Sequence, residues 1–355
     1  MGNKYKRWVW CVVALLMAGL VLLGGFTAFI DPYFHYHGPL PFVKYELKSE
    51  RYQNNGIVRH FDYDAIITGS SMTECFRTSQ LDELFGVKSV KVPFSGGSFR
   101  EVNENLQVAV DHNPELKMVV RCLDANRFFD HKDKMDYDDY PDYLYDESVW
   151  NDASYLFNKD ILMTAVQNLH GYMASGNNAM SMDEYVNWSN FYPYGRDAIL
   201  GAFAPEEVER TEYRTEITQE EYRMMDESIS QNITELIATH PEIEFYIYIS
   251  PYSIYCMDYW RRSGTLERQL LAEKYYIEKL LPYDNVKLFT FFTDYDTVCN
   301  PDNYKDVAHH GGWVNSRILE YMKSDTYRLT IDNYEDYCQE VWDYYISFDY
   351  ESLYE

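Results

Sequence analysis

A short apolar run, Asp64-Ala65-Ile66-Ile67-Thr68, leads directly into Gly69-Ser70-Ser71-Met72. The run predicts a buried strand, and residues 73–86, which end in a glycine, predict a helix. A hydroxyl on such a turn lies at a sheet edge, where the helix N–H groups and dipole favour developing negative charge. Acyl-transfer enzymes place a serine nucleophile there, but a Gly-Ser-Ser sequence is more often an ordinary turn. A catalytic interpretation therefore needs a base, an orienting acid and oxyanion donors elsewhere in the chain.

The composition limits the classes of partner. The 355 residues include 31 Lys plus Arg against 57 Asp plus Glu, a formal net charge of −26, which should repel nucleic acid. A hydrophobic fraction of 46% suffices for one large domain or two small ones. The 35 tyrosines suit either a packed core or stacking on sugars and other flat-faced polar ligands.

Motifs for cofactors and metals are absent from the sequence. There is no Gly-x-Gly-x-x-Gly, no phosphate-binding loop and no Cys-x-x-Cys pair among the six cysteines. Residues 130–142 are acidic but lack the glycine and final glutamate of an EF-hand, which favours a solvated loop. His35 and His37 have no acidic or cysteine cluster beside them and favour an interfacial aromatic collar over a metal site. We expect no cofactor, no metal and mostly buried thiols.

The N-terminus predicts a membrane anchor. Residues 8–30 carry no charge over 23 positions, long enough to cross a bilayer, and Lys4, Lys6 and Arg7 precede them. A cleavable signal peptide is the alternative, but the run is long and its cleavage site is poor, with Phe26 at the −3 position. We predict a single-pass cell-membrane protein with a cytoplasmic N-terminus and an extracytoplasmic main domain.

The rest of the chain alternates short apolar strands with helices. The predicted strands are Ala65–Thr68, Ser89–Val92, Met118–Leu123, Phe245–Ser250 and Val286–Phe292. This pattern predicts an α/β fold, three layers around a parallel five-stranded sheet. The predicted divisions are a tail and anchor (1–30), a juxtamembrane segment (31–60), an α/β domain (61–330) with a mixed helical and loop insertion (130–214), and an acidic C-terminal helix (331–355).

Ligands of parallel sheets bind at the carboxyl ends of the strands, so each strand exit is a candidate site. The second strand is followed by Pro93-Phe94-Ser95-Gly96-Gly97-Ser98, whose glycines let a backbone N–H approach a ligand or simply form a turn. The third is followed by Asp124-Ala125-Asn126-Arg127, where the asparagine is either an oxyanion donor or a turn cap. The fourth is followed by Ser250-Pro251-Tyr252-Ser253, a predicted pocket wall.

The last strand exit carries the strongest catalytic signal. Asp306 and His309 are three residues apart, so one turn can bring the carboxylate to the imidazole Nδ1–H. That contact fixes the tautomer and leaves Nε2 free to accept a serine proton. A histidine-rich turn that caps the following helix is the alternative.

Together these blocks resemble the SGNH (GDSL-like) hydrolase superfamily, over roughly residues 62–322. The likeness is greatest to its membrane-anchored branch, which includes D-alanyl-lipoteichoic acid transfer proteins and polysaccharide O-acyl-modifying enzymes. Gly69-Ser70-Ser71-Met72 is similar to the family's Gly-Asp-Ser-Leu block, with Ser71 in the nucleophile slot and Ser70 in place of aspartate. Asp306 and His309 match its Asp-x-x-His.

The resemblance implies a flavodoxin-like sheet and an acyl-enzyme mechanism. It makes Ser71, His309 and Asp306 the catalytic residues. Its oxyanion donors would be the N–H of Ser71, a glycine that maps to Gly96 or Gly97, with Gly97 our prediction, and Asn126. The family's Gly-x-Asn block has Asp124 here in place of glycine.

We therefore predict a membrane-anchored esterase or O-acyltransferase acting on acylated cell-envelope polysaccharide or a teichoic-acid-like polymer. A membrane acyltransferase is a candidate partner. The alternative is a non-catalytic envelope protein of the same fold that binds a glycan or such a partner. Hydrolysis and transfer differ only in whether water or a hydroxyl reaches the acyl-enzyme, so the sequence leaves both open, together with the acyl group and acceptor.

Overall fold

The computed structural model describes residues 2–137, 140–146, 148–177, 180–210 and 214–355. By its contacts the chain divides into two compact units. The N-terminal unit comprises residues 1–61 and 139–181, and the sheet unit comprises residues 62–138 and 182–355. The predicted insertion 130–214 is therefore divided between the two units.

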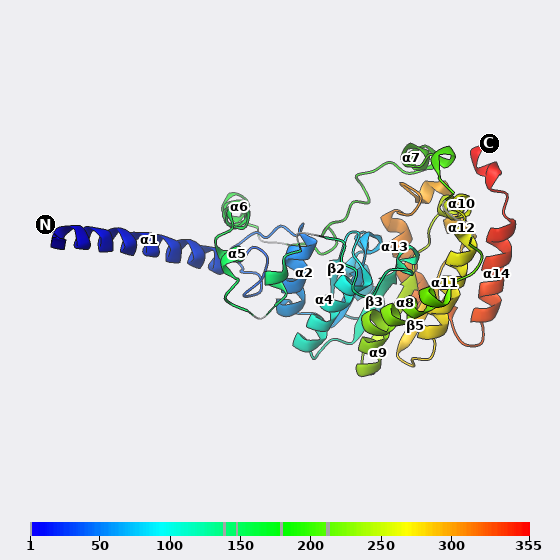
Figure 1. The fold of residues 1–355 in the computed structure, drawn as a ribbon, viewed down its shortest axis with the longest axis horizontal. Coiled ribbons are helices and arrows are strands. Elements are labelled where there is room, and N and C mark those ends of the chain that lie inside the picture. The colour runs from blue at the N-terminus through cyan, green and yellow to red at the C-terminus, as the bar shows by residue number, and fades with distance from the viewer. Residues whose placement is uncertain (1, 138–139, 147, 178–179, 211–213) are drawn as a thin grey trace. The chain divides into compact units, whose positions relative to one another are not determined.

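The N-terminal unit contains one long apolar helix and several short ones (Figure 1). Its helices are α1 (Gly2–Ile30), α2 (Glu50–His60), α5 (Ala153–Leu156) and α6 (Lys159–Ser175). Within α1, residues 4–30 are long and apolar enough to cross a membrane, and they are almost entirely unburied. Helices α5 and α6 form part of the predicted mixed helical and loop insertion.

The sheet unit is an α/β fold built on a mostly parallel sheet. Its strands are β1 (Ala65–Gly69), β2 (Ser89–Pro93), β3 (Met118–Leu123), β4 (Glu244–Ile249), β5 (Val286–Thr290) and β6 (Arg328–Leu329). Their order is β2-β1-β3-β4-β5-β6, with every pair parallel except β5 and β6. All residues of β1, β2 and β3 are buried, as expected of parallel strands covered on both faces.

The predicted number of strands needs a correction, because the described residues form six rather than five. The sixth, β6, has only two residues and pairs antiparallel with β5. It follows a reversal at Asp325, whose φ of 54° lies in the left-handed region. Two residues give no periodic pattern, so this edge strand left no signal in the sequence.

The sheet unit also contains the following helices (Figure 1). They are α3 (Thr78–Phe85), α4 (Phe99–His112), α7 (Arg196–Ala202), α8 (Gln219–Ile229), α9 (Glu235–Thr239), α10 (Ile254–Ser263), α11 (Leu266–Leu280), α12 (Tyr295–Val298), α13 (Gly312–Ser324) and α14 (Tyr334–Ser347). A π-helical turn (Ser230–Thr234) joins α8 to α9. The helix predicted from residue 73 is wrong in its first part, because α3 begins at Thr78. Its predicted glycine stop is confirmed at Gly86, which has a left-handed φ of 71°.

The six cysteines are all unpaired thiols. Cys75, Cys122 and Cys256 are buried in the sheet unit, and burial raises the pKa of each, that of Cys75 to about 12. These three therefore stay protonated at neutral pH. The prediction of mostly buried thiols holds for this unit, while Cys11 lies exposed on α1.

Candidate active site

Ser71 lies directly after β1, at the first position of a short 3-10 turn. Gly69, the last residue of β1, has φ +150° and packs so closely that an added Cβ would lie 2.6 Å from Cys122 Cβ. Only glycine fits there. The Ser70 Oγ accepts the N–H of Met72 at 3.4 Å, so Ser70 caps the turn while Ser71 Oγ projects into a cavity. The chain thus places the second serine, not the first, at the sheet edge.

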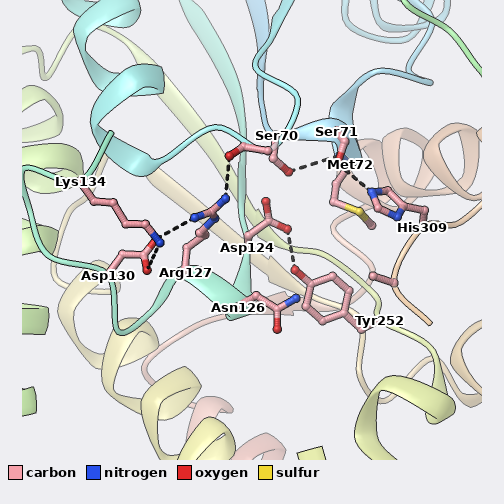
Figure 2. A pocket seen from close by; sticks show the side chains of 12 residues that line it. Ser70, Ser71, Met72, Asp124, Asn126, Arg127, Asp130, Lys134, Tyr252 and His309 are labelled. Atoms are coloured by element: carbon pink, nitrogen blue, oxygen red, sulfur yellow. Dashed lines mark hydrogen bonds and ion pairs between the residues drawn. The ribbon is translucent and has the colours of Figure 1, made fainter. Parts of the chain in front are cut away.

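His309 faces Ser71 from the loop between β5 and α13. Its Nε2 lies 2.8 Å from Ser71 Oγ, although the two residues are 238 positions apart in sequence (Figure 2). That distance is a direct hydrogen bond. The imidazole is therefore positioned to accept the serine proton, as predicted from the sequence.

Asp306 holds the other side of the same imidazole. His309 Nδ1 lies 2.9 Å and 3.0 Å from the two carboxylate oxygens, and Oδ1 also accepts the N–H groups of Ala308 and His309. Burial alone would raise the pKa of Asp306, but the hydrogen bonds and charge of His309 and these two N–H groups lower it to about 2. Asp306 is thus an anion that fixes Nδ1 as the protonated nitrogen and leaves Nε2 for Ser71.

The loop that carries both residues is fastened to the exit of β4. Ser253 Oγ donates to Val307 O at 2.6 Å, and Tyr304, fully buried, donates its hydroxyl to Pro251 O at 2.8 Å. Lys305 N–H donates to His309 O across the loop at 3.0 Å. These bonds fix the Asp306–His309 geometry without any contact to a ligand, which is the preorganisation that a general base requires.

Ser71 and His309 line one edge of a cavity of about 240 Å³ at the carboxyl ends of β1, β3 and β4 (Figure 2). Tyr252 lines it too, as predicted for a pocket wall. Its hydroxyl donates to Asp124 Oδ1 at 2.6 Å. Asp124, which stands in the glycine position of the family block, therefore presents a carboxylate to the cavity.

The predicted oxyanion donors differ in whether their backbone N–H groups are free to bind a ligand. Gly97 lacks the free N–H that we predicted, because that group donates to Phe94 O at 2.7 Å and closes a turn. Gly96, the alternative, lines the cavity in the left-handed conformation, with φ +62°. Within the described residues neither the Gly96 N–H nor the Ser71 N–H forms a hydrogen bond. Both residues thus have a backbone N–H that can donate to a ligand in the cavity.

Asn126 is exposed and lines the same cavity. Its side-chain Oδ1 accepts the indole N–H of Trp260 at 3.3 Å. Because the carbonyl oxygen is engaged by Trp260, the amide NH₂ group is left to donate to whatever occupies the cavity. Trp260 lies on α10, a helix that our sequence analysis did not find, and it was not a predicted site residue.

Asp130 and Lys134, which were predicted to lie in a solvated loop, line the cavity together with Arg127. Arg127 Nη1 lies 3.1 Å from Asp130 and 2.7 Å from Asp136, and Lys134 lies 3.1 Å from Asp130. Arg127 Nη2 further donates to Gly96 O at 2.6 Å. Arg127 therefore fixes the position of the glycine whose N–H is free.

Aromatic side chains flank His309 on its outer side. The Trp188 ring meets the imidazole edge-on at 5.7 Å between centroids. Lys305 Nζ lies 4.2 Å from the Trp188 ring and 4.4 Å from the Tyr192 ring, and 3.8 Å from Asp306 Oδ2. Trp188 and Tyr192 of the sheet unit thus lie beside the site.

No group of three or more His, Cys, Asp or Glu side chains within the described residues is arranged to hold a metal ion. The first unit contains a separate histidine–carboxylate contact. His35 Nε2 lies 3.2 Å from Asp152 Oδ1, beside a small cavity of about 140 Å³. The rings of His35, Tyr36 and Tyr155 contact one another, and the interfacial position of His35 and His37 stays a prediction.

Comparison with known proteins adds no assignment: no family model matches the chain, and no curated protein matches it significantly.

Proposed function

We propose that the protein is a serine esterase or O-acyltransferase of the SGNH type. The observation that supports this most directly is the continuous hydrogen-bonded series Ser71–His309–Asp306, with lengths of 2.8 Å and 2.9 Å. Its members come from two strand exits far apart in sequence, yet the nucleophile, base and orienting acid occupy the relations that acyl transfer requires.

The reaction proceeds in two halves. His309 Nε2 takes the proton of Ser71 as Oγ attacks an ester carbonyl, and the resulting imidazolium is stabilised by Asp306. The alkoxide leaves with the proton from His309, and an acyl-Ser71 ester forms. Water, or a sugar or polyol hydroxyl, then attacks that ester while His309 again accepts the proton. The bond between the acyl carbon and Ser71 Oγ breaks, His309 returns the proton to Oγ, and the acid or the acylated acceptor is released.

The oxyanion is assigned to the Ser71 N–H, the Gly96 N–H and the Asn126 amide. Gly96 replaces Gly97 in this set, since the N–H of Gly97 is engaged with Phe94. Asn126 is supported by the bond from Trp260, which orients its amide. Preorganised donors of this kind supply a large part of the rate enhancement in acyl transfer.

The strand order supports the flavodoxin-like arrangement that the family resemblance implies. Strands β2-β1-β3-β4-β5 are parallel in the doubly wound order, and β6 is an added antiparallel edge. The proposed site lies at the carboxyl ends of β1 and its neighbours, where such sheets bind ligands.

The substrate is assigned to the cell envelope. The apolar α1, preceded by Lys4, Lys6 and Arg7, supports an anchor with its N-terminus in the cytoplasm and the sheet unit outside. An outward-facing, acidic and aromatic-rich enzyme suits acylated polysaccharide or teichoic-acid-like polymers. A membrane acyltransferase is the partner that would deliver or receive acyl groups.

The decisive test is labelling by a fluorophosphonate probe, which forms a stable bond with an activated serine. The wild-type full chain in detergent should be labelled, and Ser71→Ala should not. Ser70→Ala is the matched control, because Ser70 caps the turn and should leave labelling in place. Labelling that survives Ser71→Ala, or its absence from a folded wild type, contradicts the proposal.

One observation favours a second candidate, a non-catalytic envelope protein that binds a glycan or an acyltransferase. The carboxylate of Asp124 lines the cavity and opposes a developing oxyanion. Under this candidate a folded wild-type protein is not labelled, and Asp124→Gly does not create labelling.

A further inference from the structure

Helix α6 of the N-terminal unit has an unusual composition for this chain. One residue in four is charged overall, yet α6 contains only Lys159 and Asp160 in its first turn, and residues 161–182 contain no Asp, Glu, Lys or Arg. A surface helix of a soluble domain ordinarily carries charged residues on its outer face. From residue 161 on, the solvent-facing side of α6 therefore lacks the charged residues expected of a helix that is exposed to water.

Helix α6 carries apolar side chains on both its inward and its outward face. Ile161, Ala165 and Asn168 point inward, and Ile161 packs with Leu144 and Tyr155 in the core of this unit. The outward face carries Met163, Val166 and Met173, exposed by 48%, 45% and 75%. The other outward side chains in the middle of the helix, Gln167 and His170, are polar without being acidic or strongly basic. Met163, Val166 and Met173 lie at helical spacing on one side of α6, with Gln167 and His170 between them.

Helix α6 is also fixed against the end of the proposed anchor. An added Cβ at Gly24 of α1 would lie 3.2 Å from the Phe157 ring, just before α6 begins, and α6 itself contacts α1. Figure 1 shows α6 end-on beside the C-terminal end of α1, whose axis runs across the view. The two helices thus cross at a wide angle, so a helix α1 that spans a bilayer leaves α6 parallel to the membrane surface.

The depth of this contact follows from helix geometry. Gly24 is 16 residues beyond Trp8, the first uncharged residue after the basic tail, and at 1.5 Å per residue this is about 24 Å. The hydrocarbon core of a bilayer is about 30 Å thick. The contact between α1 and Phe157 therefore falls within a few Å of the outer boundary of that core.

The attachment is rigid. Asp31, fully buried at the end of α1, accepts the N–H groups of His35, Tyr36 and His37 and the hydroxyl of Tyr155 on α5. Lys44 N–H donates to Asn168 O on α6 at 3.3 Å. The direction of α1 is thereby transmitted to α5 and α6.

We infer that α6 is an in-plane membrane helix whose Met163–Met173 face is immersed in the outer interface of the lipid bilayer. This inference rests on the proposed anchoring by α1. Interfacial helices bury an apolar face about 5–10 Å into the boundary between headgroups and acyl chains. Because the face has almost no charge, its binding depends on apolar contact and not on anionic lipid.

The test uses the full chain in nanodiscs of phosphatidylcholine, with single nitroxide labels at Met163→Cys, Val166→Cys or Met173→Cys. The three non-buried native thiols, Cys11, Cys299 and Cys338, are first replaced by alanine. Collision with oxygen, which concentrates in lipid, is compared with collision with a water-soluble nickel chelate. Val13→Cys in α1 is the lipid reference, and Gln339→Cys on the acidic α14 is the water reference.

We expect the ratio of oxygen collisions to nickel collisions at each of the three α6 positions to be at least threefold higher than at Gln339→Cys. This result should hold with or without added phosphatidylglycerol. Values at all three equal to the water reference overturn the inference, and this is also the result if a protein partner, rather than lipid, covers the face. If the label at Val13→Cys gives the same collision ratio as the water reference, α1 does not lie in lipid. The proposed anchoring, on which the inference rests, is then wrong. These outcomes are independent of the Ser71 labelling.

Discussion

Two histidine–aspartate contacts among the described residues, one in each unit, have similar lengths and different capacities. In the sheet unit, His309 bonds Asp306 through Nδ1 at 2.9 Å and Ser71 through Nε2 at 2.8 Å. In the N-terminal unit, His35 uses Nε2 itself to contact Asp152 at 3.2 Å, and the second Asp152 oxygen accepts the Tyr36 hydroxyl at 3.0 Å. A histidine–carboxylate pair is thus not a catalytic signature by itself. The two contacts differ in which imidazole nitrogen the carboxylate engages. In His309 it is Nδ1, so that Nε2 faces the Ser71 hydroxyl at the sheet edge, whereas in His35 it is Nε2.

The largest effect should come from replacing the two histidines in parallel. His309→Gln removes the proton acceptor and should lower Ser71-dependent hydrolysis of p-nitrophenyl acetate by about 10³-fold or more. His35→Gln keeps a donor for Asp152 and should leave the rate within about twofold, since His35 has no role in proton transfer. Initial rates of both variants, with circular dichroism to verify folding, provide the comparison. Equal losses of hydrolysis rate in the two variants would contradict a role in proton transfer for His309 alone.

A smaller effect should separate the oxyanion donor from the residue that orients it. Asn126→Ala should lower kcat by about a hundredfold, the usual result of losing one such donor. Trp260→Phe removes only the indole N–H that holds Asn126 Oδ1, so a loss of several-fold in kcat with little change in KM is expected. If Asn126→Ala is no worse than Trp260→Phe, the amide does not contact the oxyanion.

The smallest effect is on stability and follows from the lowered pKa of Asp306. Its folded pKa is about 2 against 3.8 for an ordinary aspartate, so its contribution is complete above pH 4 and is lost as the pH falls through 2. A shift of this size corresponds to about 2 kcal/mol. Denaturant unfolding should show Asp306→Asn less stable than wild type at pH 6, with the gap closing toward pH 2. A gap of constant size would show that the ionised carboxylate is not what stabilises the loop.

Most of the sheet was predictable because buried parallel strands are short uninterrupted apolar runs. All five predicted strands are present to within two or three residues at their ends. Helix α10 was missed although its signals were present. Ser253 caps its first turn by accepting the Cys256 N–H, and Gly264 ends it with φ 81°. The aromatic content of residues 254–260 obscured a helix that its caps define.

The site residues whose positions depend on a single turn of the chain were predictable from the sequence. Those whose positions depend on tertiary packing were not. The contact of Asp306 with His309 follows from their spacing, and Ser71 follows from the strand before it. The loss of Gly97 as a donor depends on a bond to Phe94 within a turn that either glycine could have formed. Arg127, Asp130 and Lys134 reach the cavity only because the loop folds back on itself through ion pairs, and such pairs have no sequence periodicity.

The unpaired cysteines have a consequence for how the protein can be made. A chain proposed to work outside the cell has no disulfide bond, and three of its thiols are buried and kept protonated by their raised pKa. Its folding therefore needs neither an oxidant to form disulfide bonds nor a disulfide isomerase to rearrange them. The same active chain should be obtained from a reducing cytosol as from an oxidising compartment, once the anchor is accommodated by detergent or lipid.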